Sequence, residues 1–348
     1  MICNLQLLRA FAALSVVYLH IVSDAGLNLG IGFGNYGVDL FFVISGFTMS
    51  YAGNMPAGKF FLRRCIRILP LYWFATLGTF AIAWIAPTMI QSASASLPHL
   101  LRSLVFLPYP NRFGMLQPTL ALGWTLNYEM YFYFLFTIAL IFTLRFAPVV
   151  ACFFIVLGVA AIRFLSIEDK SVLFYADPIV YEFCLGVIVY YTAKALSRAG
   201  PALWLSVPLR SSLVIASIVA AACLPLQEHF GHGERALWAG IPAAALVLAA
   251  VLLERKCGLA ARNGWVLLLG DSSYVLYLIH PYIVYGAIRL ILDPAAMGTG
   301  GLALSIVALM LAAALAAICV YVYVERPVLA YLRAKLTPNT PLLAPRPV

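Results

Sequence analysis

Long apolar stretches constrain this chain more than any other feature of its sequence. Hydrophobic residues make up 64% of the 348 positions and charged residues only 10%, which is far from the balance of soluble domains. A transmembrane helix needs about 20 mostly apolar residues. Ten stretches fit, near residues 5–22, 36–53, 66–87, 120–144, 147–166, 176–196, 208–226, 235–254, 266–292 and 302–324. The sequence predicts an all-α, polytopic membrane protein of about ten helices and excludes a secreted enzyme, a nucleic-acid binder and a disordered regulator.

The distribution of Lys and Arg predicts the orientation of these helices. Cytoplasmic connections of membrane proteins carry an excess of basic residues. With the N-terminus inside, 16 of the 22 Lys and Arg fall on the inner side. Both termini are therefore expected in the cytoplasm, in a multi-pass protein of the plasma membrane, the inner membrane of a bacterium.

The same pattern gives the domain organisation. Residues 1–327 are expected to form one transmembrane domain, and residues 328–348 a disordered cytoplasmic tail with a Pro-rich end. The segment 97–107 is apolar but too short to span, and it is expected to lie in the interface or to re-enter the membrane. The seven cysteines fall in spans or on the inner side, and none has metal-ligand spacing. We expect no disulfide and no metal site.

Ionisable side chains inside predicted spans are costly and indicate functional sites. They are Arg9, His20, Asp39, Glu129, Glu182, Asp271 and His280. Arg9 and His20 are 11 residues apart, close to three helical turns, so they share one face with an axial separation of about 16 Å. One alternative is that Arg9 reaches the inner headgroups while His20 lies at the outer interface.

Three of the other spans carry candidate residues. Asp39 begins the second span and is expected at the depth of His20, while Ser45 and the adjacent glycine are small enough for a helix or an elongated ligand to approach closely. Glu129 lies halfway along the fourth span, where a carboxylate needs a cation, hydrogen-bond donors or a wet cavity. His280 precedes a proline and has either a hydrogen-bonded structural role or a catalytic one.

A pair of arginines precedes the third span. Arg64 and Arg67 are three residues apart, so on a helix they share a face and present two planar guanidinium groups suited to phosphate oxygens. The alternative is that they orient the helix and contact lipid headgroups, as basic residues of inner loops commonly do.

In their order along the chain, these motifs resemble the acyltransferase 3 family of integral membrane O-acyltransferases, and its exopolysaccharide and O-antigen acetyltransferases in particular. The matching segments are Leu8-Arg9-Ala10, His20, Gly37-Val38-Asp39, Arg64-Cys65-Ile66-Arg67, Trp124-Thr125-Leu126 with Glu129, Tyr277-Leu278-Ile279-His280-Pro281 and Glu325-Arg326-Pro327. Threonine replaces the commoner serine in Trp124-Thr125-Leu126. The resemblance runs from about residue 5 to residue 327.

The resemblance implies an acyl group, acetyl above all, taken from cytoplasmic acyl-CoA and delivered to a hydroxyl of an extracytoplasmic polysaccharide or lipid-linked oligosaccharide. Arg64 and Arg67 correspond to an Arg-x-x-Arg motif expected to hold the CoA phosphates, and Arg9 with His20 to an Arg-x10-His motif. Arg9 and Ser45 are the further donor-binding candidates. Membrane lipids are expected partners, nucleic acid is not, and homo-oligomerisation is left open.

A sugar hydroxyl that attacks a thioester needs a base near neutral pH, and His20 is the candidate. Asp39 is expected to orient its imidazole, with Glu129 in reserve and His280 as a further candidate. Direct transfer and an acyl-histidine intermediate both fit. The rival functions are a transporter or flippase of lipid-linked saccharides, which would also place charges inside the membrane, and a non-enzymatic component that binds polysaccharide.

Overall fold

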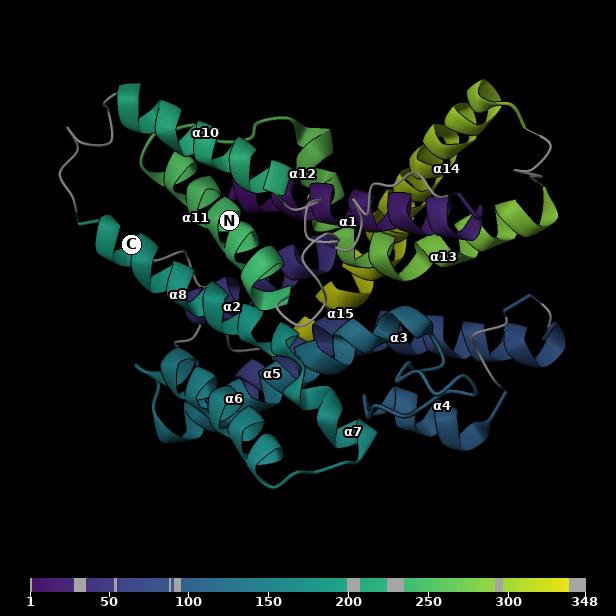
Figure 1. Ribbon diagram of the computed structural model, residues 1–348, viewed down its shortest axis with the longest axis horizontal. Helices are drawn as coiled ribbons and strands as arrows, with labels where there is room; N and C mark the ends of the chain where they lie inside the picture. The colour runs from purple at the N-terminus through teal and green to yellow at the C-terminus, as the bar shows by residue number, and fades with distance from the viewer. Residues whose placement is uncertain are drawn as a thin grey trace. The chain divides into compact units, whose positions relative to one another are not determined.

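The computed structural model describes residues 2–27, 36–52, 55–87, 89–90, 95–198, 207–223, 235–291 and 297–337, and the regular secondary structure of these ranges is helical (Figure 1). No strand occurs within these ranges, and an all-α fold is confirmed. Seven of the described helices are long and apolar enough to cross a membrane. The number is eight if α12, Gly264–Asp271, and α13, Ser273–Leu290, which meet at a bend of 75°, form one span. The expected count of ten and the orientation of the termini stay predictions.

The chain divides into two compact units, one of them reaching to Tyr51 and continuing over Glu182–Pro327, the other covering Ala52–Tyr181 and Val328–Thr337. The helices of the first unit, besides α12 and α13, are α1 Cys3–Asp24, α2 Tyr36–Ala52, α8 Tyr181–Leu196, α10 Val207–Cys223, α11 Ile241–Arg255 and α14 Thr299–Val320. Those of the second unit are α3 Ala57–Ile85, α4 Leu97–Leu104, α5 Trp124–Phe142, α6 Ala147–Phe164 and α7 Lys170–Leu173.

Glycines set the close approach of helices in the first unit. A Cβ atom on Gly46 of α2 would lie 2.1 Å from the carbonyl oxygen of Phe183 in α8, and one on Gly186 would lie 2.2 Å from the carbonyl oxygen of Val43. Only glycine fits such backbone contact. Of the two alternatives expected at this glycine, the close approach of a helix is therefore confirmed.

The first helix is fixed at its start and packs along α13. The backbone N–H groups of Cys3 and Asn4 donate to the carboxylate of Glu254 at 2.9 and 2.7 Å. These are donors that a helix N-terminus leaves unsatisfied, and a carboxylate there also interacts favourably with the helix dipole. Beyond this cap, α1 lies side by side with α13 (Figure 1). The pair carries both histidines that the sequence singles out.

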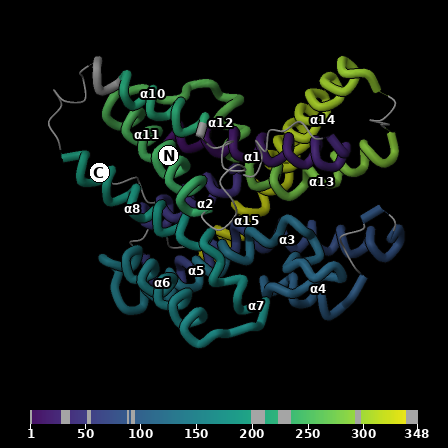
Figure 2. The backbone as a smooth tube through the Cα atoms, viewed as in Figure 1, coloured from purple at the N-terminus to yellow at the C-terminus, as the bar shows by residue number. Residues whose placement is uncertain are grey.

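In the second unit, α3 begins at Ala57, nine residues before the predicted start of the third span. The added turns contain Arg64. Arginine favours helix formation, but its charge keeps it out of a span predicted from hydropathy. The hydroxyl of Tyr72 donates to the carbonyl oxygen of Ser103 at 3.0 Å and ties α3 to α4, while α5 and α6 run side by side (Figure 2). The apolar segment 97–107 contains the eight-residue helix α4, which is too short to span.

The expected disordered tail is wrong over residues 328–336. After α14, the π-helical turn Tyr321–Glu325 leads into α15, Arg326–Leu336, which continues the helix. The second residue of α15 is Pro327, which has no backbone N–H to donate to the preceding π-helical turn. Residues 338–348 lie outside the described part of the chain.

Candidate functional site

His20 of α1 and His280 of α13 meet in the first unit. Their ring centroids are 5.0 Å apart, with the rings edge to face at 60°. His280 is fully buried and His20 partly exposed. The ring of Tyr277 lies 6.3 Å from His280 and packs in turn on Phe41 of α2 at 6.3 Å. Three helices therefore position this pair of imidazoles.

The hydrogen bonds of the two rings define which nitrogen can act as a base. Nδ1 of His20 lies 2.9 Å from the carbonyl oxygen of Val16, and Nδ1 of His280 lies 3.0 Å from that of Leu276. A carbonyl oxygen only accepts, so in a neutral ring Nδ1 carries the hydrogen and Nε2 the lone pair. Nε2 of His280 is buried with no hydrogen-bond partner among the described residues. Both rings are thus held in the tautomer whose Nε2 accepts a proton.

Arg9 occupies the same interface nearer the start of α1. Its Nε donates to the hydroxyl of Ser273 at 3.2 Å, and Ser273 is the fully buried first residue of α13, directly after the bend from α12. The shared face of Arg9 and His20, predicted from their spacing, agrees with this geometry because both side chains meet α13.

Asp39, which is expected to orient the imidazole of His20, is paired with a different residue in this structure. Both oxygens of Asp39, which is fully buried, accept from Arg235 at 2.9 Å, through Nε and Nη2. A Cβ atom on Gly37 would lie 2.3 Å from the carbonyl oxygen of Ala12. Because Ala12 precedes His20 by eight residues, α2 starts more than two turns deeper than the prediction assumed. Asp39 therefore forms a buried ion pair with Arg235.

In the second unit, Arg64, Tyr133 and Glu129 form a connected cluster. The guanidinium of Arg64 lies 5.6 Å from the ring centroid of Phe60 and 5.8 Å from that of Tyr133. The Tyr133 hydroxyl donates to the carboxylate of Glu129, one turn back on α5. Glu129 therefore has a hydrogen-bond donor, one of the expected alternatives. Arg64 and Arg67 share a helix, as predicted.

The other ionisable or small candidates lie elsewhere. Ser45 is buried on α2 beside the glycine contact with α8. Glu182 is fully buried at the start of α8, and its Cγ lies 3.1 Å from where a Cβ of Gly240 would be. Asp271 is the last residue of α12, at the bend.

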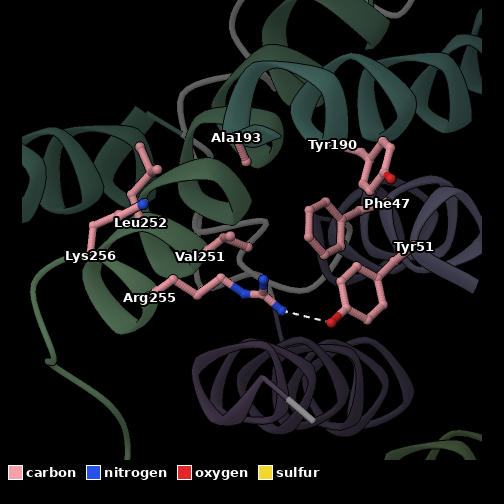
Figure 3. A pocket seen from close by; sticks show the side chains of 8 residues that line it. All are labelled: Phe47, Tyr51, Tyr190, Ala193, Val251, Leu252, Arg255 and Lys256. Atoms are coloured by element: carbon pink, nitrogen blue, oxygen red, sulfur yellow. Dashed lines mark hydrogen bonds between the residues drawn. The ribbon is translucent and has the colours of Figure 1, made fainter. Parts of the chain in front are cut away.

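A small pocket between α2, α8 and α11 is a separate feature (Figure 3). It is lined mainly by apolar and aromatic side chains, and Arg255 crosses it to donate to the Tyr51 hydroxyl at 2.9 Å. The ammonium of Lys256 donates to the carbonyl oxygen of Ser197 at 2.7 Å. Both cations are used in contacts between helices and the pocket contains no acid or histidine, so it fits helix packing rather than catalysis.

Sequence reasoning missed the partners of these residues. Tyr133 could have been found, because it follows Glu129 by four residues on one helix. Ser273 and Arg235 could not, because each is more than 190 positions from its partner and only packing brings them together.

Comparisons with known proteins match nearly the whole length of the chain. The sequence model of the acyltransferase 3 family, described as an acyltransferase domain, matches residues 4–324. The chain is also 33% identical over 324 residues, 91% of its own length and 95% of the relative's, to the exopolysaccharide production protein ExoZ of Rhizobium meliloti (strain 1021). No solved structure matches the chain. Every candidate residue described above lies inside the matched range.

Proposed function

This chain belongs to the acyltransferase 3 family, and on that premise we propose that it moves an acetyl group from cytoplasmic acetyl-CoA to a hydroxyl of an extracytoplasmic or lipid-linked polysaccharide sugar. The name of the Rhizobium meliloti relative supports exopolysaccharide as the class of acceptor. The membrane is the plasma membrane, the inner membrane of a bacterium.

The observation that carries this proposal is the pair of imidazoles held with Nε2 as proton acceptor. Nε2 of His20 takes the proton of the sugar hydroxyl, the oxygen attacks the thioester carbonyl, and the carbon–sulfur bond breaks. The thiolate of CoA then takes the proton back from His20. His20 is assigned as the base rather than His280, because His20 is partly exposed while His280 is fully buried.

His280 acts in this scheme as a positioning residue. It is fully buried, and its ring packs edge to face against the ring of His20 and so limits the positions that the His20 ring can take. While His280 is neutral, it does not repel the positive charge that His20 gains on taking up a proton, as a charged neighbour would.

The donor is assigned to the arginines. A CoA molecule carries phosphates, and Arg64 and Arg67 present guanidinium forks on one helix face. Nε of Arg64 is buried without a hydrogen-bond partner among the described residues, and two aromatic rings hold its guanidinium. Arg9 and Ser45, both in the first unit, stay donor-binding candidates from the sequence.

The test is direct transfer. Protein purified in detergent is given radiolabelled acetyl-CoA and de-O-acetylated exopolysaccharide from the producing strain. Label in the polysaccharide, dependent on His20, is the expected result. Transport of a lipid-linked saccharide across proteoliposomes with no label transferred would instead support a flippase.

A further inference from the structure

A second polar cluster lies one turn beyond His20, where α1 and α13 end. Asp24 follows His20 by four residues, so it lies on the same face about 6 Å further along the helix. Tyr285 and Arg289 follow His280 by five and nine residues on α13. Arg289 interacts electrostatically with Asp24, and so does Tyr285.

The position of Asp24 is unfavourable for the helix that carries it. The N–H of Leu27 donates to the carbonyl oxygen of Val22 at 3.0 Å, and Gly26 has a positive φ of 67°, so α1 ends directly after Asp24. A carboxylate there lies at the negative end of the helix dipole. Its Oδ2 is also shielded from solvent, with no hydrogen-bond partner among the described residues. Both features cost stability, which indicates a functional reason for the residue.

The charges around Asp24 select what could satisfy it. Arg289 disfavours a bound metal ion, and no group of three His, Cys, Asp or Glu side chains gathers as metal ligands in the part of the chain that the structure describes. Asp24 in turn disfavours an anion. A neutral molecule with several hydroxyl groups fits both, because each hydroxyl donates to a carboxylate and accepts from a guanidinium. A sugar has this chemistry.

We propose that Asp24, Tyr285 and Arg289 form the acceptor subsite, which holds a sugar by its hydroxyl groups within one helical turn of His20. The inference rests on the proposed function, since it names where the polysaccharide of that reaction binds. The predicted sidedness puts this end of α1 at the outer side.

The experiment measures acceptor binding separately from transfer. De-O-acetylated oligosaccharide fragments of the exopolysaccharide are titrated onto the detergent-purified protein, and acetyl-CoA is titrated in parallel. Asp24→Asn should weaken oligosaccharide binding about 10-fold or more, as loss of a hydrogen bond to a charged group does, and leave acetyl-CoA binding unchanged. Glu168→Gln, the same change at an exposed outer acid, is the matched control and should bind like wild type.

A charge reversal separates this subsite from a simple link between helices. The double variant Asp24→Arg with Arg289→Asp keeps an ion pair at this place, so its melting temperature should stay close to that of wild type while its oligosaccharide affinity is lost. Wild-type affinity in the double variant, or unchanged binding in Asp24→Asn, would overturn the subsite. Wild-type protein that binds oligosaccharide but transfers no label would leave the subsite standing and refute the proposed function. Wild-type protein that binds no oligosaccharide would overturn the subsite whatever the transfer assay shows.

Discussion

Replacing His20 by glutamine should remove the base while leaving the fold intact. A general base contributes about 10²–10⁴-fold to a rate, which corresponds to about 3–5 kcal/mol of transition-state stabilisation. Glutamine keeps a donor that can reach the carbonyl oxygen of Val16, now the partner of Nδ1, but it has no nitrogen lone pair to accept a proton. Acetyl transfer should therefore fall at least 100-fold, with acetyl-CoA affinity unchanged because the assigned donor contacts are all elsewhere.

The assay needs a histidine control from outside the pair. His99 is buried in the second unit, where its Nε2 donates to the carbonyl oxygen of Gln117 at 2.9 Å, and glutamine can replace that donor. His99→Gln should transfer at close to the wild-type rate. A His280→Gln protein should keep measurable transfer with a slower kcat, since the residue acts only through His20. Near wild-type transfer in His20→Gln would refute the assignment of the base and point to His280.

Three further results are expected. A tag at Lys59 should report the cytoplasm and a tag at Glu168 the outer side, because basic residues collect on inner connections; reversed labelling would exchange the donor and acceptor faces. Ala in place of Arg64 should weaken acetyl-CoA binding by about 1.5–3 kcal/mol, with only partial rescue by Lys, and the same holds for Arg67; unchanged affinity in the double Ala variant would return the pair to headgroup contact. Gly186→Val should lower the melting temperature sharply, because its Cβ would lie 2.2 Å from a backbone oxygen of α2; an unchanged melting temperature would contradict that contact.

The periodic parts of the fold could be predicted from the sequence. The boundaries of α1 and α6 agree with the predicted spans within two residues, because an apolar run has its own length and ends at polar residues. The start of α3 was predicted nine residues late, since the first turns of this helix are basic and hydropathy does not report them. Helix formation and burial in lipid are different properties, and only the second has a hydropathy signal.

The candidate site could be predicted only as a list of residues. Because an ionisable side chain inside a span is energetically unfavourable, the sequence identifies His20, Asp39 and His280 as separate candidates. The contact between the two histidines cannot be predicted in this way, because it depends on how α13 packs after its bend. The prediction that Asp39 lies level with His20 depends on the assumption that every span begins at the membrane edge. The close approach of Gly37 to Ala12 instead brings α2 in at a deeper level, beside Arg235.

The ion pair of Asp39 and Arg235 gives a last prediction, on whether Asp39 has a chemical role. Removing one partner of a buried pair leaves an uncompensated charge and costs about 3–5 kcal/mol. The Arg235 side chain keeps 25% of its surface exposed, so Asp39→Asn should cost about 3 kcal/mol, at the lower end of that range. The loss should appear in the denaturation midpoint.

Replacing both partners by apolar side chains of similar volume removes the charges together, which is often neutral or stabilising. Asp39→Leu combined with Arg235→Met should therefore recover most of the stability lost in Asp39→Asn. Since Nδ1 of His20 faces Val16 rather than Asp39, the double variant should also keep acetyl transfer within a few-fold of wild type. Recovered stability with transfer still lost at least 100-fold would show that the carboxylate takes part in the reaction. The imidazole would then need a different orientation during turnover, one that reaches Asp39.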